Sequence, residues 1–327
     1  MNKKIFITGG GGYVGSNLIP SLLKKGFKVT VLDLFIYGED VLDEHTDLEC
    51  IKGDIRDQEL LKKSIQGHDL VIHLACISND PSFELNPLLG RSINLDAFEP
   101  LVRISKSAGV KRFIYASSSS VYGVKNELDV NETMTLEPMT DYSKFKAECE
   151  KILSSYNSTN FVTTTIRPAT VCGYARRQRL DVVVNIFTNI AFHKREISVF
   201  GGKQLRPNIH INDMTKAYIK VLEAPDALIN NEIFNVGDKN YTVLELAEIT
   251  KSVVGNDVKL VLSHSDDNRS YHISSKKIFN LLNFKTENTI KDAVIDLQLA
   301  IKENKLKDSL SNPKYFNIKT MQKINLV

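Results

Sequence analysis

The sequence predicts an α/β protein with a doubly wound parallel sheet and a smaller α/β C-terminal domain. Two observations predict this class. Strand and helix patterns alternate through the first half of the chain, and a glycine-rich stretch separates the first strand from the first helix. The chain has only 17 glycines in 327 residues, yet five of them fall between Gly9 and Gly15. Because glycine lets a backbone approach a ligand closely, this cluster indicates a binding loop.

Hydrophobic periodicity defines the individual elements. The stretch 4–8 is a short β-rich run, and 13–25 carries apolar residues at helical spacing up to Gly26, a typical helix end. The run LVIHLA at 70–75 is apolar almost throughout, as in a strand buried on both faces of a parallel sheet. The same rules predict strands at 27–33, 48–52, 112–116 and 161–166, and helices at 57–66, 88–108 and 141–156.

The alternation stops after Pro168, which predicts a domain boundary there. We expect a sheet domain over 1–168 and a smaller domain over 169–327, with the chain returning to the first domain near 210–236. The second part is predicted to hold helices at 182–192, 213–223 and 242–254 and a strand at 233–236. The tail after Lys305 is polar and rich in lysine, so we expect it to be only partly ordered.

Composition excludes several classes of function. Apolar residues make up 42% and charged residues 25%, with a net charge of +3, so nothing indicates nucleic-acid binding. No segment has the length of a signal-peptide core or a membrane-spanning helix. The cysteines are widely spaced and no His/Asp/Glu set has ligand spacing, so we expect free thiols, no metal and a cytoplasmic protein.

The glycine cluster has the spacing GxxGxxG at Gly9, Gly12 and Gly15, with Tyr13 and Val14 between the last two. Such a loop makes a tight turn, admits a pyrophosphate against the backbone and packs its helix closely on the sheet. The phosphates then lie at the helix N-terminus. The strand–loop–helix context therefore predicts a Rossmann dinucleotide site.

Asp33 ends the second predicted strand, about twenty residues after the loop, where a carboxylate accepts hydrogen bonds from the adenosine ribose. NADP would instead need a nearby arginine, and residues 34–38 supply none. The sequence predicts NAD.

Tyr142 and Lys146 lie four residues apart at the start of a predicted helix, so both project from one face. A lysine ammonium beside a tyrosine lowers the phenol pKa, which favours a role as general base. Upstream, 115–123 (YASSSSVYG) places serines at the C-terminal end of a strand, the edge where open α/β sheets bind ligands.

Together these residues resemble the extended short-chain dehydrogenase/reductase family, in its NAD-dependent nucleotide-sugar epimerase/dehydratase branch. The resemblance covers the chain to about residue 300. Its carriers are TGGGGYVG, Asp54-Ile55, His73-Leu74-Ala75, Asn94, SSSSVYG, YSKFK, Arg167-Pro168 and RPNIHIND.

The resemblance implies roles for these positions. Ser118 would be the catalytic serine, Tyr142 the general base, and Lys146 the residue that binds the nicotinamide ribose. Asp54 and Ile55 would flank the adenine, and Leu74, Ala75 and Asn94 would complete the cofactor site. On the substrate side, the resemblance implies that Arg206 and Arg269 clamp a nucleotide diphosphate, and Asn185 and Tyr271 are expected in the sugar pocket.

The implied reaction is a 4-epimerisation of a nucleotide-diphosphate sugar by transient oxidation at C4. Sugar dehydratases of this family carry an acid in the pair after the catalytic serine, where this chain has Ser119 and Ser120. A net C4 dehydrogenase of a nucleotide-activated sugar or heptose stays open, because Arg179–Asn185 resembles a segment of capsule- and heptose-pathway members. A non-catalytic NAD-binding regulator is the third possibility. The family also implies a homodimer through the helices at 88–108 and 141–156.

Overall fold

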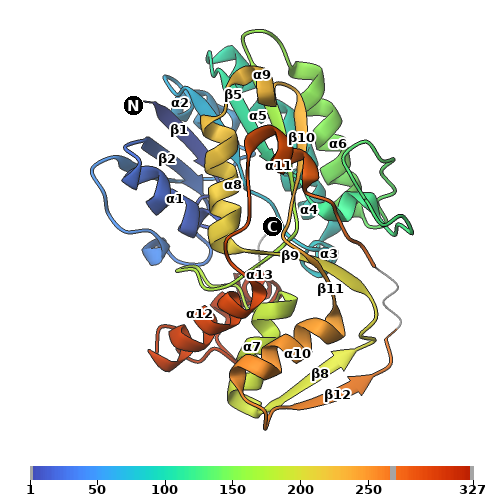
Figure 1. The fold of residues 1–327 in the computed structure, drawn as a ribbon. Coiled ribbons are helices and arrows are strands. Elements are labelled where there is room, and N and C mark those ends of the chain that lie inside the picture. Colours follow the sequence, from blue (N-terminus) through green and yellow to red (C-terminus); the bar gives the residue numbers. More distant parts are fainter. Residues whose placement is uncertain (1–2, 266–269, 325–327) are drawn as a thin grey trace.

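The computed structural model describes residues 3–265 and 270–324, which form two lobes (Figure 1). The larger lobe is built on a seven-stranded sheet in the order β10-β6-β5-β4-β1-β2-β3. All seven strands pair in parallel, which confirms the predicted fold class. The strands are β1 (Lys4–Thr8), β2 (Lys28–Asp33), β3 (Leu48–Lys52), β4 (Leu70–His73), β5 (Arg112–Ala116), β6 (Val162–Pro168) and β10 (Glu232–Val236).

Helices cover both faces of this sheet because its strands alternate buried apolar residues between the two sides. On β1, Ile5 and Ile7 join one hydrophobic cluster while Phe6 joins the other. The first cluster is closed by α1 (Gly15–Lys24), α8 (Ile211–Glu223) and α11 (Lys276–Leu282). The second is closed by α2 (Gln58–Ser64), α5 (Phe98–Ser107) and α6 (Asp141–Tyr156).

The chain between α8 and β10 lies in the larger lobe. β10 pairs with β6 at the edge of the sheet, and α8 packs against α1. The buried Arg112 guanidinium donates hydrogen bonds to the carbonyl oxygens of Val221 (3.1 Å) and Ala224 (2.9 Å) at the end of α8. A cation at a helix C-terminus satisfies carbonyls that have no partner within the helix.

The smaller lobe forms a separate hydrophobic cluster around α7 (Val183–Lys194), α10 (Val243–Val254) and α12 (Ile290–Lys302). It carries two small sheets. One holds β11 (Asn240–Thr242), β9 (Leu205–His210) and β7 (Thr170–Cys172), and the other pairs β12 (Lys259–Ser263) with β8 (Glu196–Phe200).

One long helix predicted from the sequence is divided in the structure. The stretch 88–108 consists of α4 (Pro87–Arg91), a π-helical turn at Ser92–Asp96 and α5. The turn carries Asn94, whose side-chain amide accepts from the Ile77 nitrogen (2.8 Å) and donates to the Ile77 oxygen (2.9 Å). The π turn thus coincides with two hydrogen bonds from the Asn94 side chain to the loop after β4. Hydrophobic periodicity does not predict such a contact.

The C-terminal segment after Lys305 is described as far as Ile324. It forms α13 (Asn317–Ile324), which packs against α3 (Asp80–Glu84) close to where the lobes meet (Figure 1). The remaining short elements are α9 (Asp226–Ile229) and 3₁₀ turns at Glu39–Val41, Ser119–Tyr122 and Pro313–Tyr315. None of the helices described between residues 3 and 324 is long and apolar enough to cross a membrane.

Candidate active site

A cavity of about 480 Å³ lies between the lobes, along the edge where the strands of the large sheet end. Its walls come from the loops after β1, β2, β4 and β5, from the start of α6, and from the smaller lobe. Polar groups from many loops converge there because parallel strands end at one edge.

The glycine loop forms one wall and leaves no space for side chains. Gly9 has φ +76°, and a Cβ there would collide with the backbone nitrogen of Ala75. A Cβ on Gly15 would collide with the Gly10 carbonyl. Helix α1 begins at Gly15 without a side-chain cap, and the Ser16 and Asn17 N–H groups donate to the Gly12 (2.9 Å) and Val14 (3.2 Å) carbonyls, which fixes the shape of the loop. This cradle fits the pyrophosphate of a dinucleotide.

Asp33 lies at the end of β2, in the cavity wall. Its carboxylate accepts hydrogen bonds from the backbone N–H groups of Phe35 (2.7 Å) and Gly11 (2.9 Å). Burial raises the pKa of Asp33, whereas these two hydrogen bonds and the charge of Arg177 act to lower it. The carboxylate is therefore fixed beside the glycine loop, where the sequence places the ribose contact.

The other predicted cofactor residues divide into two groups. Tyr13, Val14, Asp54, Ile55, Leu74 and Ala75 line the cavity with the glycines. Asn94 does not line it and holds the Ile77 backbone instead. Asn94 therefore holds the loop after β4, which lines the cavity, and does not itself reach the cavity.

Ser118 and Tyr142 come together from two elements. Ser118 caps the 3₁₀ turn after β5, where its Oγ accepts from the Ser120 nitrogen (3.1 Å) and lies 2.8 Å from the Ser120 Oγ. Tyr142 lies in the first turn of α6, which a capping box at Thr140 and Ser143 starts. Both residues line the cavity.

Burial, in the first place, raises the pKa of the Tyr142 phenol, and the charge of Asp80 acts in the same direction. The charge of Arg179 and a hydrogen bond with Ser118 act to lower it. Lys146 lies one turn further along α6, with its Nζ 5.9 Å from the centre of the Tyr142 ring. The phenol pKa is thus raised, contrary to the lowering that the Tyr142–Lys146 spacing predicts.

Of the residues predicted to bind the substrate, some line the cavity and others do not. Arg206 on β9 and Tyr271 line the cavity, with the Arg206 guanidinium carbon 5.1 Å from the centre of the Tyr271 ring. Asn185 is fully buried outside it, where its side chain bonds the Gly173 nitrogen (3.0 Å) and the Arg179 oxygen (2.7 Å). Arg269 lies outside the described residues.

Several wall residues have no motif that identifies them. The basic run at 176–179 reads as a solvated or phosphate-binding stretch, yet its arginines separate in space. Arg176 is exposed and pairs with Asp43 at the surface, whereas Arg177 and Arg179 line the cavity. Asn317 and Met321 reach the same cavity from α13. Neither residue has a local sequence signal for this position.

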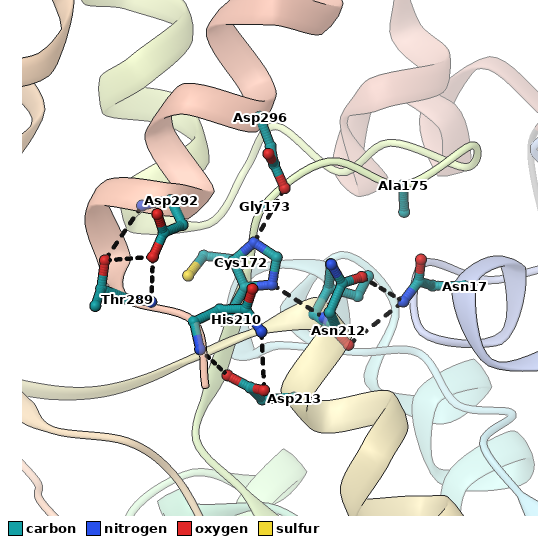
Figure 2. Close-up of polar contacts among 12 residues, drawn as sticks. Asn17, Cys172, Gly173, Ala175, His210, Asn212, Asp213, Thr289, Asp292 and Asp296 are labelled. Carbon is teal, nitrogen blue, oxygen red and sulfur yellow. Dashed lines mark hydrogen bonds and ion pairs between the residues drawn. The ribbon is translucent and has the colours of Figure 1, made fainter. Parts of the chain in front are cut away.

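The RPNIHIND segment connects the two lobes through contacts of His210 (Figure 2). His210 ends β9, and its Nδ1 accepts a hydrogen bond from the Asn212 nitrogen (3.1 Å) at the start of α8. Its Nε2 lies 3.2 Å from Asp296 on α12. Burial lowers the pKa of His210, as expected for a structural imidazole. Among residues 3–265 and 270–324, no group of three or more His, Cys, Asp or Glu is arranged to hold a metal ion.

The fold, the glycine loop and the cavity at the strand ends are those of a dinucleotide-dependent enzyme. Residues 5–237 match the NAD dependent epimerase/dehydratase family, and the chain belongs to that family. The predicted family, its enzymatic nature and the NAD cofactor are thereby confirmed.

Similar proteins include 4-epimerases and 4,6-dehydratases of nucleotide sugars. The UDP-glucose 4-epimerase of Lactobacillus helveticus is 26% identical over 314 residues, covering 89% of this chain and 94% of its own. A dTDP-glucose 4,6-dehydratase of Streptomyces niveus is 26% identical, covering 90% and 91%. Among solved structures, the UDP-glucose 4-epimerase of Thermotoga maritima superposes with a TM-score of 0.83 at 24% identity, covering 92% and 99%. The dTDP-glucose 4,6-dehydratase of Streptomyces venezuelae gives 0.85 at 22%, covering 94% and 100%.

Proposed function

We propose that this protein is an NAD-dependent nucleotide-sugar 4-epimerase that acts by transient oxidation at the sugar C4. The observation that carries the choice of epimerase is the chemistry around Ser118. The two residues that follow it, Ser119 and Ser120, are hydroxyl side chains, and Ser120 bonds Ser118 itself. Hydroxyl groups with ordinary pKa values are poor general acids, so elimination of water from the sugar lacks a proton donor there.

The carboxylates in the described walls of the cavity are engaged elsewhere. Asp33 accepts two backbone N–H groups, Asp54 pairs with Arg56, and Asp181 pairs with Arg179. Asp80 accepts a hydrogen bond from the Thr140 hydroxyl (2.6 Å). Each of these carboxylates therefore already accepts hydrogen bonds from groups of the protein. This arrangement favours a reaction without elimination.

Tyr142 is the proposed base. It takes the proton from the C4 hydroxyl and returns one after the sugar has presented its other face, while Ser118 hydrogen-bonds the same oxygen. Lys146 holds its ammonium near the phenol and is proposed to bind the nicotinamide ribose. Bound NAD supplies the hydride acceptor and later the hydride donor.

The smaller lobe is proposed to hold the nucleotide diphosphate. Arg206 supplies a guanidinium fork at the cavity wall, and forks of this kind bind phosphate oxygens in pairs. Arg269 is proposed as its counterpart, and Tyr271 as a wall of the sugar pocket. Asn185 is proposed to act on this pocket through the 173–179 loop that its side chain holds.

The second candidate is a net C4 dehydrogenase, which the same Ser118, Tyr142 and Lys146 would serve. Incubation with UDP-, GDP-, CDP- and dTDP-sugars, followed by mass spectrometry and NMR, separates the candidates. An epimerase gives a product of unchanged mass with an inverted C4 and no NADH. A dehydrogenase gives a ketone and NADH, and a dehydratase gives a product that has lost water, which would contradict the proposal. No turnover of any sugar, with NAD bound, would favour a regulator.

We also propose a homodimer through α5 and α6. Phe98, Val102 and Leu153 on these helices are buried within the protein, so the contact would use partly buried residues such as Ile152 and Tyr156. Light scattering at micromolar concentration tests this, and a monomer would reject it.

A further inference from the structure

Arg177 is a buried cation that forms no ion pair with the carboxylates described in the structure. Its side chain is in the cavity wall, and the residue is 4% exposed. No carboxylate among the described residues forms an ion pair with it, and its Nε has no hydrogen-bond partner. Asp33 and Asp181 act on this guanidinium through space without forming an ion pair with it. Because a buried charge is costly unless it is compensated, an anion in the cavity would stabilise Arg177 further.

Three of the groups around Arg177 belong to the cofactor half of the cavity. Its backbone N–H donates to the Ser16 Oγ (3.2 Å) in the first turn of α1, directly after the glycine loop. Its guanidinium carbon lies 3.5 Å from the centre of the Tyr37 ring, in the loop after β2. Its charge acts on Asp33. The candidate diphosphate ligand of the substrate, Arg206, comes from β9 instead.

The guanidinium is held in place by the C-terminal helix. Asn317, the first residue of α13, accepts hydrogen bonds from the Arg177 Nη2 (2.6 Å) and the Tyr37 hydroxyl (2.9 Å). Its amide donates to the Ser78 Oγ (3.0 Å), and its backbone N–H donates to Asp181 (2.8 Å). One buried side chain thus fixes loops from both lobes around the cation.

We propose that Arg177 is a phosphate ligand of the NAD site, donated by the smaller lobe, and that Asn317 is its positioning residue. The anion that would compensate Arg177 is the pyrophosphate of the dinucleotide, for which the glycine loop in the same cavity would supply the cradle. The inference rests on NAD as the cofactor and does not depend on which sugar reaction the enzyme performs.

The test compares Arg177→Gln with Arg176→Gln, a matched control because Arg176 is the adjacent, exposed arginine. Calorimetric titration of the cofactor-free protein measures binding of NAD and ADP-ribose, and ligand-observed NMR measures binding of adenosine, which has no phosphate. Loss of a charged hydrogen-bond donor is expected to weaken NAD and ADP-ribose by roughly 10- to 100-fold in Arg177→Gln. Adenosine binding should not change, and Arg176→Gln should match the wild type for all three ligands.

Two results would overturn the proposal: NAD affinity in Arg177→Gln equal to that of Arg176→Gln, or an equal loss of adenosine and ADP-ribose binding. The melting temperature of the ligand-free Arg177→Gln protein should be no lower than that of the wild type, because an uncompensated buried charge has been removed. Arg177→Lys keeps the charge without the planar fork and is expected to bind NAD with intermediate affinity. If Arg177→Gln fails to fold, equal NAD affinity of Arg177→Lys and the wild type overturns the proposal.

Asn317→Ala should weaken NAD and ADP-ribose in the same direction, with adenosine unchanged. Unchanged NAD affinity in Asn317→Ala would reject the positioning role alone. These titrations contain no sugar, so a failure here differs from a failure of the proposed epimerase reaction.

Discussion

The Lys146 ammonium donates a 2.7 Å hydrogen bond to the Ala116 carbonyl oxygen at the end of β5. This contact ties the first turns of α6 to the strand that precedes Ser118. Tyr142 and Ser118 come from different elements, so their mutual position depends on how α6 is docked on β5. The predictions begin with this pair.

Tyr142→Phe removes only the hydroxyl that the proposed mechanism uses as a base. We expect turnover to fall by about 100-fold or more, since general acid–base catalysis contributes at least that much. The NAD affinity should change little. Tyr241→Phe, on β11 and outside the cavity walls, serves as the control. Full activity of Tyr142→Phe on the accepted sugar would contradict the assignment.

Lys146→Met keeps much of the side chain's length and removes its charge. The phenol of Tyr142 then loses a nearby cation, so its pKa should rise and the acid limb of the pH–rate profile should move to higher pH. Lys144→Met, on the exposed side of α6, should leave the profile in place. A pH–rate profile of Lys146→Met that superposes on the wild-type profile would exclude this role for the ammonium.

Asp33→Asn should weaken NAD and strengthen NADP. The carboxylate that repels a 2′-phosphate is lost, so the site no longer excludes NADP by charge. Affinities for both dinucleotides, measured by calorimetry, give the ratio directly. An unchanged preference for NAD over NADP would mean that Asp33 does not bind the adenosine ribose.

The buried Arg167–Glu150 ion pair contacts the residue that precedes Ser118. The Arg167 Nη2 lies 2.6 Å from Glu150, whose side chain also accepts a hydrogen bond from Ser117, next to Ser118. Glu150→Gln leaves a buried guanidinium uncompensated, so the free energy of unfolding should fall by about 3–5 kcal/mol.

The control for this pair is Glu59→Gln, which breaks the exposed Lys62–Glu59 pair. It should lower the free energy of unfolding by about 1 kcal/mol or less. Urea unfolding measures both variants, and similar losses would contradict the difference between buried and exposed pairs.

His73 predicts a dependence of stability on pH. Burial, with a further contribution from the charge of Lys146, lowers the pKa of His73 to about 3. Between about pH 6.5 and pH 3, His73 is therefore protonated in the unfolded chain, with its ordinary pKa near 6.5, but neutral in the folded protein. This contribution is fully present above about pH 6.5 and is lost as the pH falls towards 3, by up to about 1.4 kcal/mol per pH unit.

Urea unfolding between pH 7.5 and pH 5, at roughly half-unit steps below the unperturbed histidine pKa, checks this slope against that of His73→Leu. The variant should lose less stability per pH unit than the wild type. His210, whose pKa burial also lowers, remains in both proteins and contributes to both slopes. Parallel slopes would show that His73 does not contribute.

The sequence by itself determined the parallel sheet, the glycine loop, Asp33 and the proximity of Tyr142 to Lys146. Each of these depends on a local pattern: period-two or helical spacing, a turn that only glycine fits, or four residues on one helix face. The fold class and the cofactor were therefore predicted correctly from residues close together in the chain.

Only the tertiary structure decided which polar residues reach the cavity. The amides of Asn94 and Asn185 hold loops instead of lining it, while Arg177 and Asn317 enter it without any motif. The hydrogen bond between Arg177 and Asn317 spans 140 residues of sequence, and its partners lie in an irregular loop and at a helix start. No periodicity encodes such a contact, because burial of the cation is set by the docking of separate elements.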